Sequence, residues 1–257
     1  MKKLIPFLLL FFAFACTKNG SDSSNDDSIN NETADDTSDG TLHNAFSLFD
    51  EDNTSIYIEN NDVVIETNGL PNHTSPYWST SNELYVAPTV TSIQEMAPGN
   101  IDNFNGSYTL RVDVNPELAS SSSSTGLGAI GIAVSGAVIY NDEEGPNVPL
   151  ENEIGTLDYS GAHTGPQSYH YHLEPKAWSD DDDVLVGIIS DGFFVYGRKC
   201  SLTGTYPTDL DASGGHTHTT DHSESDEYHY HVNNEAYLNQ YYIIFPGDYQ
   251  GTPNAIQ

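Results

Sequence analysis

The stretch Tyr169-His170-Tyr171-His172 decides how this chain is interpreted, because it returns as Tyr228-His229-Tyr230-His231. With 16 Tyr and 10 His among 257 residues, chance gives about 0.0015 occurrences of the string, so two copies indicate an internal repeat. Side chains alternate along a β-strand, so the two histidines of each copy share one face and the two tyrosines share the other. Two such imidazoles lie about 7 Å apart and can converge on one metal ion.

The similarity between the two copies extends upstream of these strings. Asp158-Tyr-Ser-Gly-Ala-His163 matches Asp211-Ala-Ser-Gly-Gly-His216, and Gly131–Tyr140 matches Gly187–Tyr196. Each unit, 131–172 and 187–231, therefore predicts two apolar strands joined by a glycine turn, then a loop, then the YHYH strand. We expect the units to pack about a pseudo-twofold axis, with six histidines around one shared cation. These are His163, His170, His172, His216, His229 and His231.

Short segments rich in Val, Ile, Tyr and Thr, separated by Gly, Pro, Asn and Asp, indicate an all-β protein. The expected strands are Ser55–Thr67, Glu83–Val86, Tyr108–Val114, Gly126–Tyr140, Val184–Tyr196 and Tyr241–Phe245. Their spacing predicts an antiparallel sandwich or barrel-like domain over 45–257 that contains the duplicated unit. The tyrosines of both strings are expected to pack in its core and to hydrogen-bond through their hydroxyl groups.

The first residues have the pattern of a bacterial lipoprotein signal. Lys2 and Lys3 precede an apolar run that is too short for a comfortable membrane span and that ends at Ala15-Cys16. We predict a signal peptide over 1–15 and a membrane anchor outside the cytoplasm through lipidated Cys16. An ordinary signal peptide with an incidental cysteine is the alternative. Residues 16–44 predict a disordered acidic tether, similar to export signals of lipoproteins on the outer-membrane surface.

Charge limits the partners. Asp and Glu outnumber Lys and Arg by 38 to 7, for a net charge of −31, so DNA and RNA are excluded and cations are attracted. No protein partner is indicated.

Histidine ligands suit copper or zinc, and copper is favoured because it is highest in the affinity order of the divalent ions. Weaker candidate ligands are His73, His218 and His222. Cys200 is either a small buried hydrophobic residue or a thiolate ligand.

Other interpretations stay open. Asp158 and Asp211 either cap the turns that follow them or orient ligand histidines. A metal-dependent hydrolase or oxidase acting on extracellular substrates would need a general base, for which Asp191, Asp211 and Glu174 are available. A third class is a carbohydrate-binding or adhesive module without metal, in which Trp78 and Trp178 would stack on sugars.

With both strings and their loops in view, the chain resembles the YHYH-domain family of exported bacterial proteins. The resemblance covers roughly residues 65–245 and is carried by four features. These are Gly69-Leu-Pro-Asn-His73, Asp191-Gly-Phe-Phe-Val-Tyr-Gly197, Asp211-Ala-Ser-Gly-Gly-His216 and the two YHYH strings. Phe194 stands where similar proteins often have proline. The resemblance implies an exported setting and supplies neither a reaction nor a catalytic residue.

Overall fold

The computed structural model describes residues 40–88, 101–102, 104, 106–165 and 168–257. These residues belong to one compact unit, Thr37–Gln257, so the expected signal peptide, Cys16 and most of the expected tether lie outside the described residues. Residues 40–44 are described, and the His43 side chain accepts a hydrogen bond from Ala45 N at the start of the 3₁₀ helix η1 (Asn44–Leu48). Within the described ranges, every helix is too short or too polar to cross a membrane.

A three-stranded antiparallel sheet is formed by β1 (Thr54–Glu59), β2 (Asp62–Thr67) and β3 (Tyr108–Asp113). The single strand expected over Ser55–Thr67 is therefore a hairpin. Its turn places Asn60 at φ 59°, a left-handed conformation that asparagine tolerates better than most residues. A small β6–β7 ribbon (Glu143–Gly145 and Val148–Pro149) and the 3₁₀ helices η2 (Leu150–Asn152) and η3 (Ile154–Thr156) follow later in the chain.

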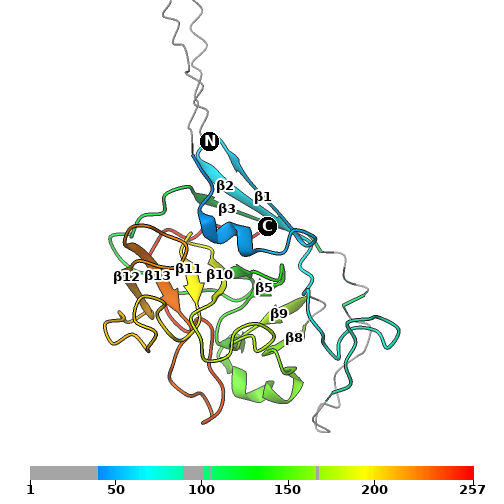
Figure 1. The fold of residues 1–257 in the computed structure, drawn as a ribbon. Coiled ribbons are helices and arrows are strands. Elements are labelled where there is room, and N and C mark those ends of the chain that lie inside the picture. Colours follow the sequence, from blue (N-terminus) through cyan, green and yellow to red (C-terminus); the bar gives the residue numbers. More distant parts are fainter. Residues whose placement is uncertain (1–39, 89–100, 103, 105, 166–167) are drawn as a thin grey trace, which may run out of the picture. The chain divides into compact units, whose positions relative to one another are not determined.

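An eight-stranded sheet carries the repeat, in the order β12-β13-β11-β10-β4-β5-β9-β8 (Figure 1). Its strands are β4 (Gly131–Ala133), β5 (Val138–Ile139), β8 (Ala162–Thr164), β9 (Tyr169–Tyr171), β10 (Leu185–Ile189), β11 (Phe194–Tyr196), β12 (Gly215–His218) and β13 (Glu227–His231). The protein is thus all-β, as predicted. The sheet is mixed, because β5 runs parallel to β9 and β11 runs parallel to β13.

The two halves of this sheet have the same pairing pattern. In each half an apolar hairpin (β4–β5 or β10–β11) is followed outward by the parallel YHYH strand and then by an antiparallel edge strand. The halves meet where β4 pairs antiparallel with β10, with Ile188 opposite Ile132. This arrangement is the one that a duplicated unit with a pseudo-twofold axis between β4 and β10 predicts.

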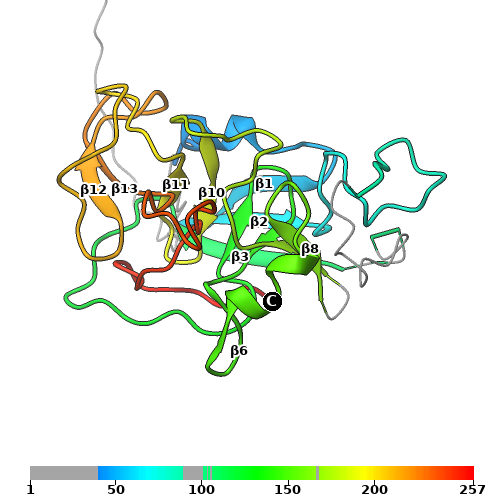
Figure 2. The ribbon, with the colours of Figure 1, turned by 90° about the horizontal axis from the view of Figure 1, so that it is seen from below.

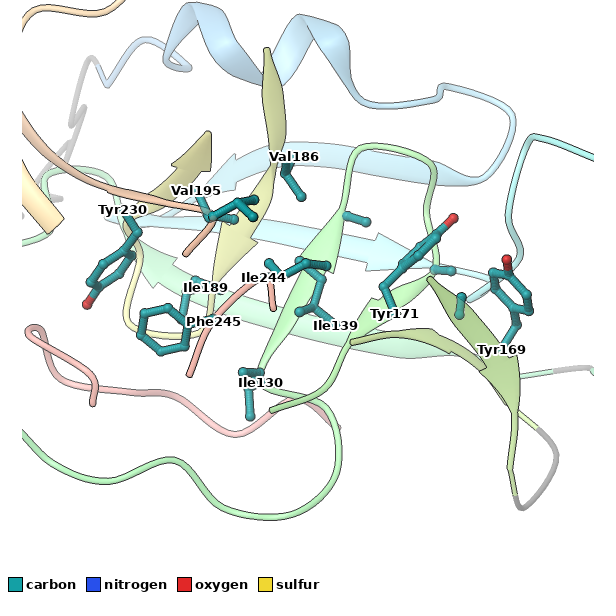
Figure 3. Packing of buried hydrophobic residues seen from close by; sticks show 14 of the residues in the cluster. Ile130, Ile139, Tyr169, Tyr171, Val186, Ile189, Val195, Tyr230, Ile244 and Phe245 are labelled. Atoms are coloured by element: carbon teal, nitrogen blue, oxygen red, sulfur yellow. The ribbon is translucent and has the colours of Figure 1, made fainter. Parts of the chain in front are cut away.

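The core lies on both faces of the large sheet. On one face the three-stranded sheet packs its Ile65 and Val112 side chains against a cluster that includes Ile132 and Ile188. The other face carries the cluster drawn in Figure 3, which contains Tyr169, Tyr171 and Tyr230. Burial of each large apolar side chain contributes about 1.5–3 kcal/mol, so the two clusters fix the strands that carry the histidines.

The tyrosine prediction is confirmed for Tyr169, Tyr171 and Tyr230, whereas Tyr228 is only partly buried against the same cluster. Tyr169 and Tyr230 are buried at 1% and 0% exposure, and their hydroxyl groups donate to the Oδ2 atoms of Asp158 and Asp191 at 2.7 and 2.6 Å. Because the tyrosines face the cluster of Figure 3, the histidines between them face the opposite side of the sheet.

Candidate metal centres

The six repeat histidines form two clusters near opposite edges of the large sheet. His163 on β8 meets His170 and His172 at the β9 strand, while His216 on β12 meets His229 and His231 on β13. Figure 1 and Figure 2 show β12 and β13 on the side of the fold opposite β8. In the sheet order, β9 and β13 are five strand spacings apart, which is about 24 Å along the sheet.

The expectation of one cation shared by both units is therefore wrong. The two halves of the sheet meet at the apolar strands β4 and β10, and the YHYH strands pair on the outer sides of the two hairpins. Each unit instead builds a centre of its own.

The first centre brings three imidazoles and one carboxylate together. The Nε2 atoms of His163 and His170 lie 2.9 Å apart. Glu144 Oε1 lies 3.4 Å from His163 Nε2 and 3.5 Å from His172 Nε2. One ligand atom from each of the three histidines lies within 4.8 Å of the others. This is the separation expected of atoms that surround one metal ion.

Hydrogen bonds outside the first centre fix which ring nitrogen carries the proton. Nδ1 of His170 donates to Ser168 O at 3.0 Å, and Nδ1 of His172 donates to Asn141 O at 2.6 Å. Carbonyl oxygens only accept, so both protons are on Nδ1. His163 Nδ1 donates to Thr156 Oγ1 at 2.7 Å, because that hydroxyl group already donates to a backbone carbonyl.

Burial keeps these rings neutral. It lowers the pKa of His163 to about 3, helped by the charge of His172, and it lowers the pKa of His172 to about 4. The pKa of His170 is also held well below its usual value by burial. At neutral pH each Nε2 atom therefore presents a lone pair to the same small space. Such lone pairs repel one another unless a cation lies between them.

Two buried atoms of this centre lack hydrogen-bond partners among the described residues, namely His172 Nε2 and Glu144 Oε1. Burial, followed by the charge of Glu153, raises the pKa of Glu144 to about 7. Leaving a buried polar atom unsatisfied costs about 1–3 kcal/mol, and a bound metal ion would satisfy both atoms.

The second centre has a related arrangement, in which the group with metal-like spacing is Cys200, His216 and His231. His216 Nε2 lies 3.1 Å from the Nε2 atoms of both His229 and His231. Burial lowers the pKa of His229 to about 4 and that of His231 to about 3. Cys200 is buried, and its Sγ atom lies within 4.8 Å of the ligand atoms of His216 and His231. Both interpretations of Cys200 thus hold in part, since it is buried and also lies beside ligand candidates.

The outer hydrogen bonds of the second centre use equivalent positions. His229 Nδ1 donates to Glu227 O at 3.0 Å, and His231 Nδ1 donates to Gly197 O at 2.7 Å. His216 Nδ1 contacts Asp209 Oδ1 at 3.0 Å. Such partners hold the ring orientation and raise the basicity of the metal-binding nitrogen. The Asp209 carboxylate replaces the Thr156 hydroxyl group of the first centre.

The DxSG loops place the first histidine of each centre. Asp158 Oδ1 accepts from Ser160 N and Asp211 Oδ1 accepts from Ser213 N, both at 2.8 Å. Gly161 follows at φ 72°, and Gly214 takes the equivalent position at φ 83°, a conformation that glycine adopts without a Cβ penalty. The hydrogen bonds of both aspartates to the loops and to tyrosines support the turn-capping interpretation.

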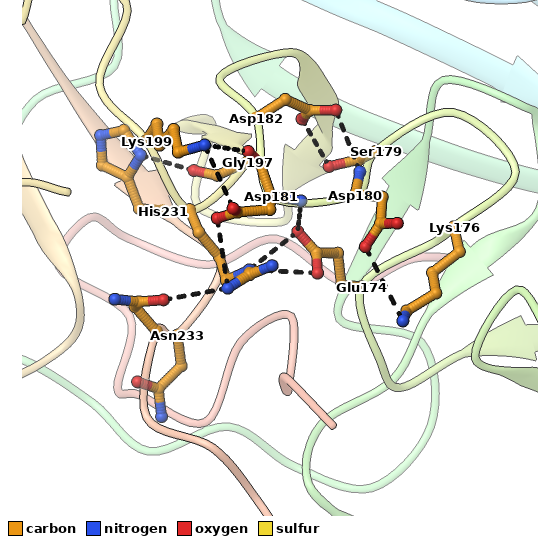
Figure 4. A network of polar contacts seen from close by, with 12 residues as sticks. Glu174, Lys176, Ser179, Asp180, Asp181, Asp182, Gly197, Lys199, His231 and Asn233 are labelled. Carbon is orange, nitrogen blue, oxygen red and sulfur yellow. Dashed lines mark hydrogen bonds and ion pairs between the residues drawn. The ribbon is translucent and has the colours of Figure 1, made fainter. Parts of the chain in front are cut away.

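A polar network fixes the backbone beside the second centre (Figure 4). Arg198 Nε lies 3.1 Å from Glu174 Oε1, and Asp181 contacts Arg198 Nη1 at 3.4 Å and Lys199 Nζ at 3.2 Å. These residues hold the segment that supplies the Gly197 carbonyl to His231. Glu174, one of the three bases suggested by the sequence, is thereby occupied in a buried ion pair.

The weaker histidine candidates lie elsewhere or at the border of a centre. His73 is on the tyrosine side of β9, where its Nε2 pairs with Tyr171 OH at 2.7 Å and its Nδ1 donates to Thr74 O at 2.8 Å. His222 stacks on Tyr196. His218 Nε2 lies 3.3 Å from Asp209 Oδ2, and together with His216 they form a third group with metal-like spacing.

Several residues proposed for the enzyme and the carbohydrate-binding alternatives have other roles in the structure. Asp191 accepts from Tyr230 OH and from Gly251 N, so it serves the core, as Asp211 serves its loop. Trp78, proposed to stack on sugars, is 6% exposed and donates through Nε1 to His73 O. Trp178 is partly buried against the tyrosine cluster and donates to Leu185 O. A buried indole cannot stack on a carbohydrate ligand, so the sugar-stacking role expected for Trp78 is wrong.

Sequence reasoning missed Glu144, Thr156 and Asp209. The repeat contained a signal for them, because Glu144 and Cys200 each follow matching tyrosines, Tyr140 and Tyr196, by four residues. Thr156 and Asp209 likewise precede the first histidine of their units by seven residues. The residue types at these equivalent positions differ between the two units, so identical residues in the two units do not reveal them.

Comparison with known proteins agrees with this description. Residues 107–208 match the family described as YHYH protein, a segment that includes the first centre, the β10–β11 hairpin and Cys200. No curated protein and no solved structure matches the chain. This match over residues 107–208 supports membership of the YHYH family.

Proposed function

We propose that this protein binds two transition-metal ions, one at each histidine centre, and that copper is preferred to zinc. The observation that supports the proposal is the orientation of the rings. Nδ1 of every centre histidine is engaged outside its centre, so the Nε2 lone pairs converge within it, as the 2.9 Å His163–His170 contact shows. Among buried side chains, such convergence is favourable only around a cation.

The chemistry of the donors supports the choice of metal. Imidazole nitrogen is a ligand for copper, zinc, nickel and iron, and copper has the highest affinity among the divalent ions. Calcium and magnesium prefer shells made of oxygen ligands. The net charge of −31 raises the cation concentration near the protein.

Closed centres favour metal binding over catalysis. The first-centre histidines are buried, with exposures of 5% for His163, 2% for His170 and 0% for His172. Glu144 occupies the position where a fourth ligand would stand. A catalytic site keeps one coordination position open to substrate, whereas a binding or structural site is closed by protein ligands.

The proposed setting is the cell envelope. The signal-like segment 1–15, followed by Cys16, supports a lipid anchor outside the cytoplasm, and the acidic residues after it support placement at the outer-membrane surface. There the protein would bind, buffer or present the metal.

Metal analysis of the purified chain tests the proposal. The first-centre variant carries His170→Ala and His172→Ala, the second-centre variant carries His229→Ala and His231→Ala, and the fourfold variant carries all four changes. After loading with copper and desalting, we expect two ions per chain in the wild type, one in each centre variant and none in the fourfold variant. Equal uptake by the wild type and the fourfold variant would refute the proposal.

A further inference from the structure

Glu144 and Cys200 occupy equivalent positions in the two halves of the fold. Each follows the second strand of an apolar hairpin, four residues after Tyr140 or Tyr196. The residue one position after each of these tyrosines, Asn141 or Gly197, supplies the carbonyl that accepts from the last histidine of the YHYH string. The backbone on which the two side chains are mounted is therefore placed in the same way.

The two side chains also approach equivalent histidines. Glu144 Oε1 lies 3.4 Å from His163 Nε2 and 3.5 Å from His172 Nε2. Cys200 Sγ lies within 4.8 Å of the ligand atoms of His216 and His231, the counterparts of those two residues. Cys200 is 1% exposed, and its contact with His218 Nδ1 is long, at 4.0 Å.

We infer that the two centres are chemically different, with three histidines and the Glu144 carboxylate in one and three histidines and the Cys200 thiolate in the other. The inference rests on the proposed function and assigns a different ion preference to each centre. A thiolate favours soft ions such as Cu(I) and also suits Zn(II), whereas a carboxylate favours harder ions.

Metal binding at the Cys200 centre requires the thiolate. The sulfur forms a bond to the metal, and the thiol proton leaves to the solvent. The second centre also has the Asp209 carboxylate on His216, where the first centre has the neutral Thr156 hydroxyl group. The second centre thus has two negative groups, the Cys200 thiolate as a ligand and Asp209 behind His216, and the first centre has one, Glu144. This difference strengthens the preference of the second centre for a tightly held cation.

Cobalt(II) is the probe that separates these ligand sets, because a thiolate bound to Co(II) gives an intense near-ultraviolet charge-transfer band that histidine and carboxylate do not give. The chain is prepared with Cys16→Ser, so that Cys200 is its only cysteine. We expect two cobalt ions per chain and one thiolate band. The band should persist in the first-centre variant and disappear in the second-centre variant.

Substitutions at the two equivalent positions give matched controls. Cys200→Ser should abolish the band, and Glu144→Gln should leave it unchanged. Glu144→Cys should add a second thiolate and roughly double the band intensity. Two bound cobalt ions without a thiolate band would overturn this inference and leave the proposed function intact. A wild-type chain that takes up no cobalt and no copper would overturn both.

Discussion

The Nε2 atoms of His163 and His170 lie 2.9 Å apart although neither carries a proton that could join them. Their Nδ1 atoms donate to Thr156 Oγ1 and Ser168 O, at 2.7 and 3.0 Å, and burial keeps both rings neutral. The two lone pairs therefore point toward each other, and a cation bound between them would turn their repulsion into two bonds.

Metal should accordingly stabilise the fold. At free copper 100 times the dissociation constant, each occupied centre adds about 2.7 kcal/mol to the free energy of unfolding. For a domain of this size that is roughly 5–10 °C in Tm for each centre. Calorimetry with copper and after chelation measures the shift. Each centre variant should keep about half of it, and an unchanged Tm in the wild type would contradict the proposed centres.

Acid should weaken the metal-free protein through its histidines. Burial holds the pKa of His172 and His229 at about 4 and that of His231 at about 3, against 6.5 for an ordinary histidine. The unfolded chain then binds more protons below pH 6.5, so the stability is complete above that pH and falls as the pH approaches 4.

Denaturation at a series of pH values checks this dependence. Carboxyl groups with raised pKa values, such as Glu144 at about 7, act in the opposite direction, so the informative quantity is the difference between two proteins. From pH 6.5 to pH 4 the wild type should lose more stability than the fourfold variant. Parallel curves for the two proteins would show that the histidines are not buried as neutral rings.

Asp209 should raise the metal affinity of the second centre through its hydrogen bond to His216, without being a ligand itself. Its Oδ1 atom accepts from His216 Nδ1 at 3.0 Å, and removal of such a partner typically weakens metal binding by about 10–100-fold. Calorimetric titration of Asp209→Ala in the first-centre variant measures this loss. Asp209→Asn should restore part of the affinity, because its amide oxygen still accepts. In the second-centre variant, which keeps only the first centre, Asp209→Ala should have no effect.

The Glu174–Arg198 ion pair should matter for stability. The side chains are 1% and 6% exposed, and removal of one partner leaves the other charge buried. We expect Arg198→Met to cost about 3–5 kcal/mol and the double change with Glu174→Met to recover much of it. Urea denaturation of the three proteins gives both numbers. A loss below about 1 kcal/mol would mean that the pair behaves like an exposed salt bridge.

The repeat predicted the local structure better than the arrangement of its parts. Alternation alone placed Tyr169 and Tyr230 in the core and their histidine neighbours on the opposite face, because the side-chain period of a strand is fixed by backbone geometry. It could not give the strand order, which depends on where each YHYH strand pairs. The pairing of Ile139 with Tyr171, on the outer side of its hairpin, separates the two centres.

Side chains contributed by loops were harder to predict. Glu144 and Asp209 belong to the centres through the path of the backbone, and neither repeats the residue type of its counterpart. The hairpin at Asn60 was missed for a related reason, since one left-handed residue reverses a segment whose composition is uniformly that of a strand.

The most direct test is the position of bound copper in a crystal of the loaded protein, located by anomalous diffraction at the copper edge. We predict two peaks, one bounded by the Nε2 atoms of His163, His170 and His172, and one by those of His216, His229 and His231. A single peak, peaks outside both clusters, or rings turned so that Nδ1 faces inward would contradict the two-centre account.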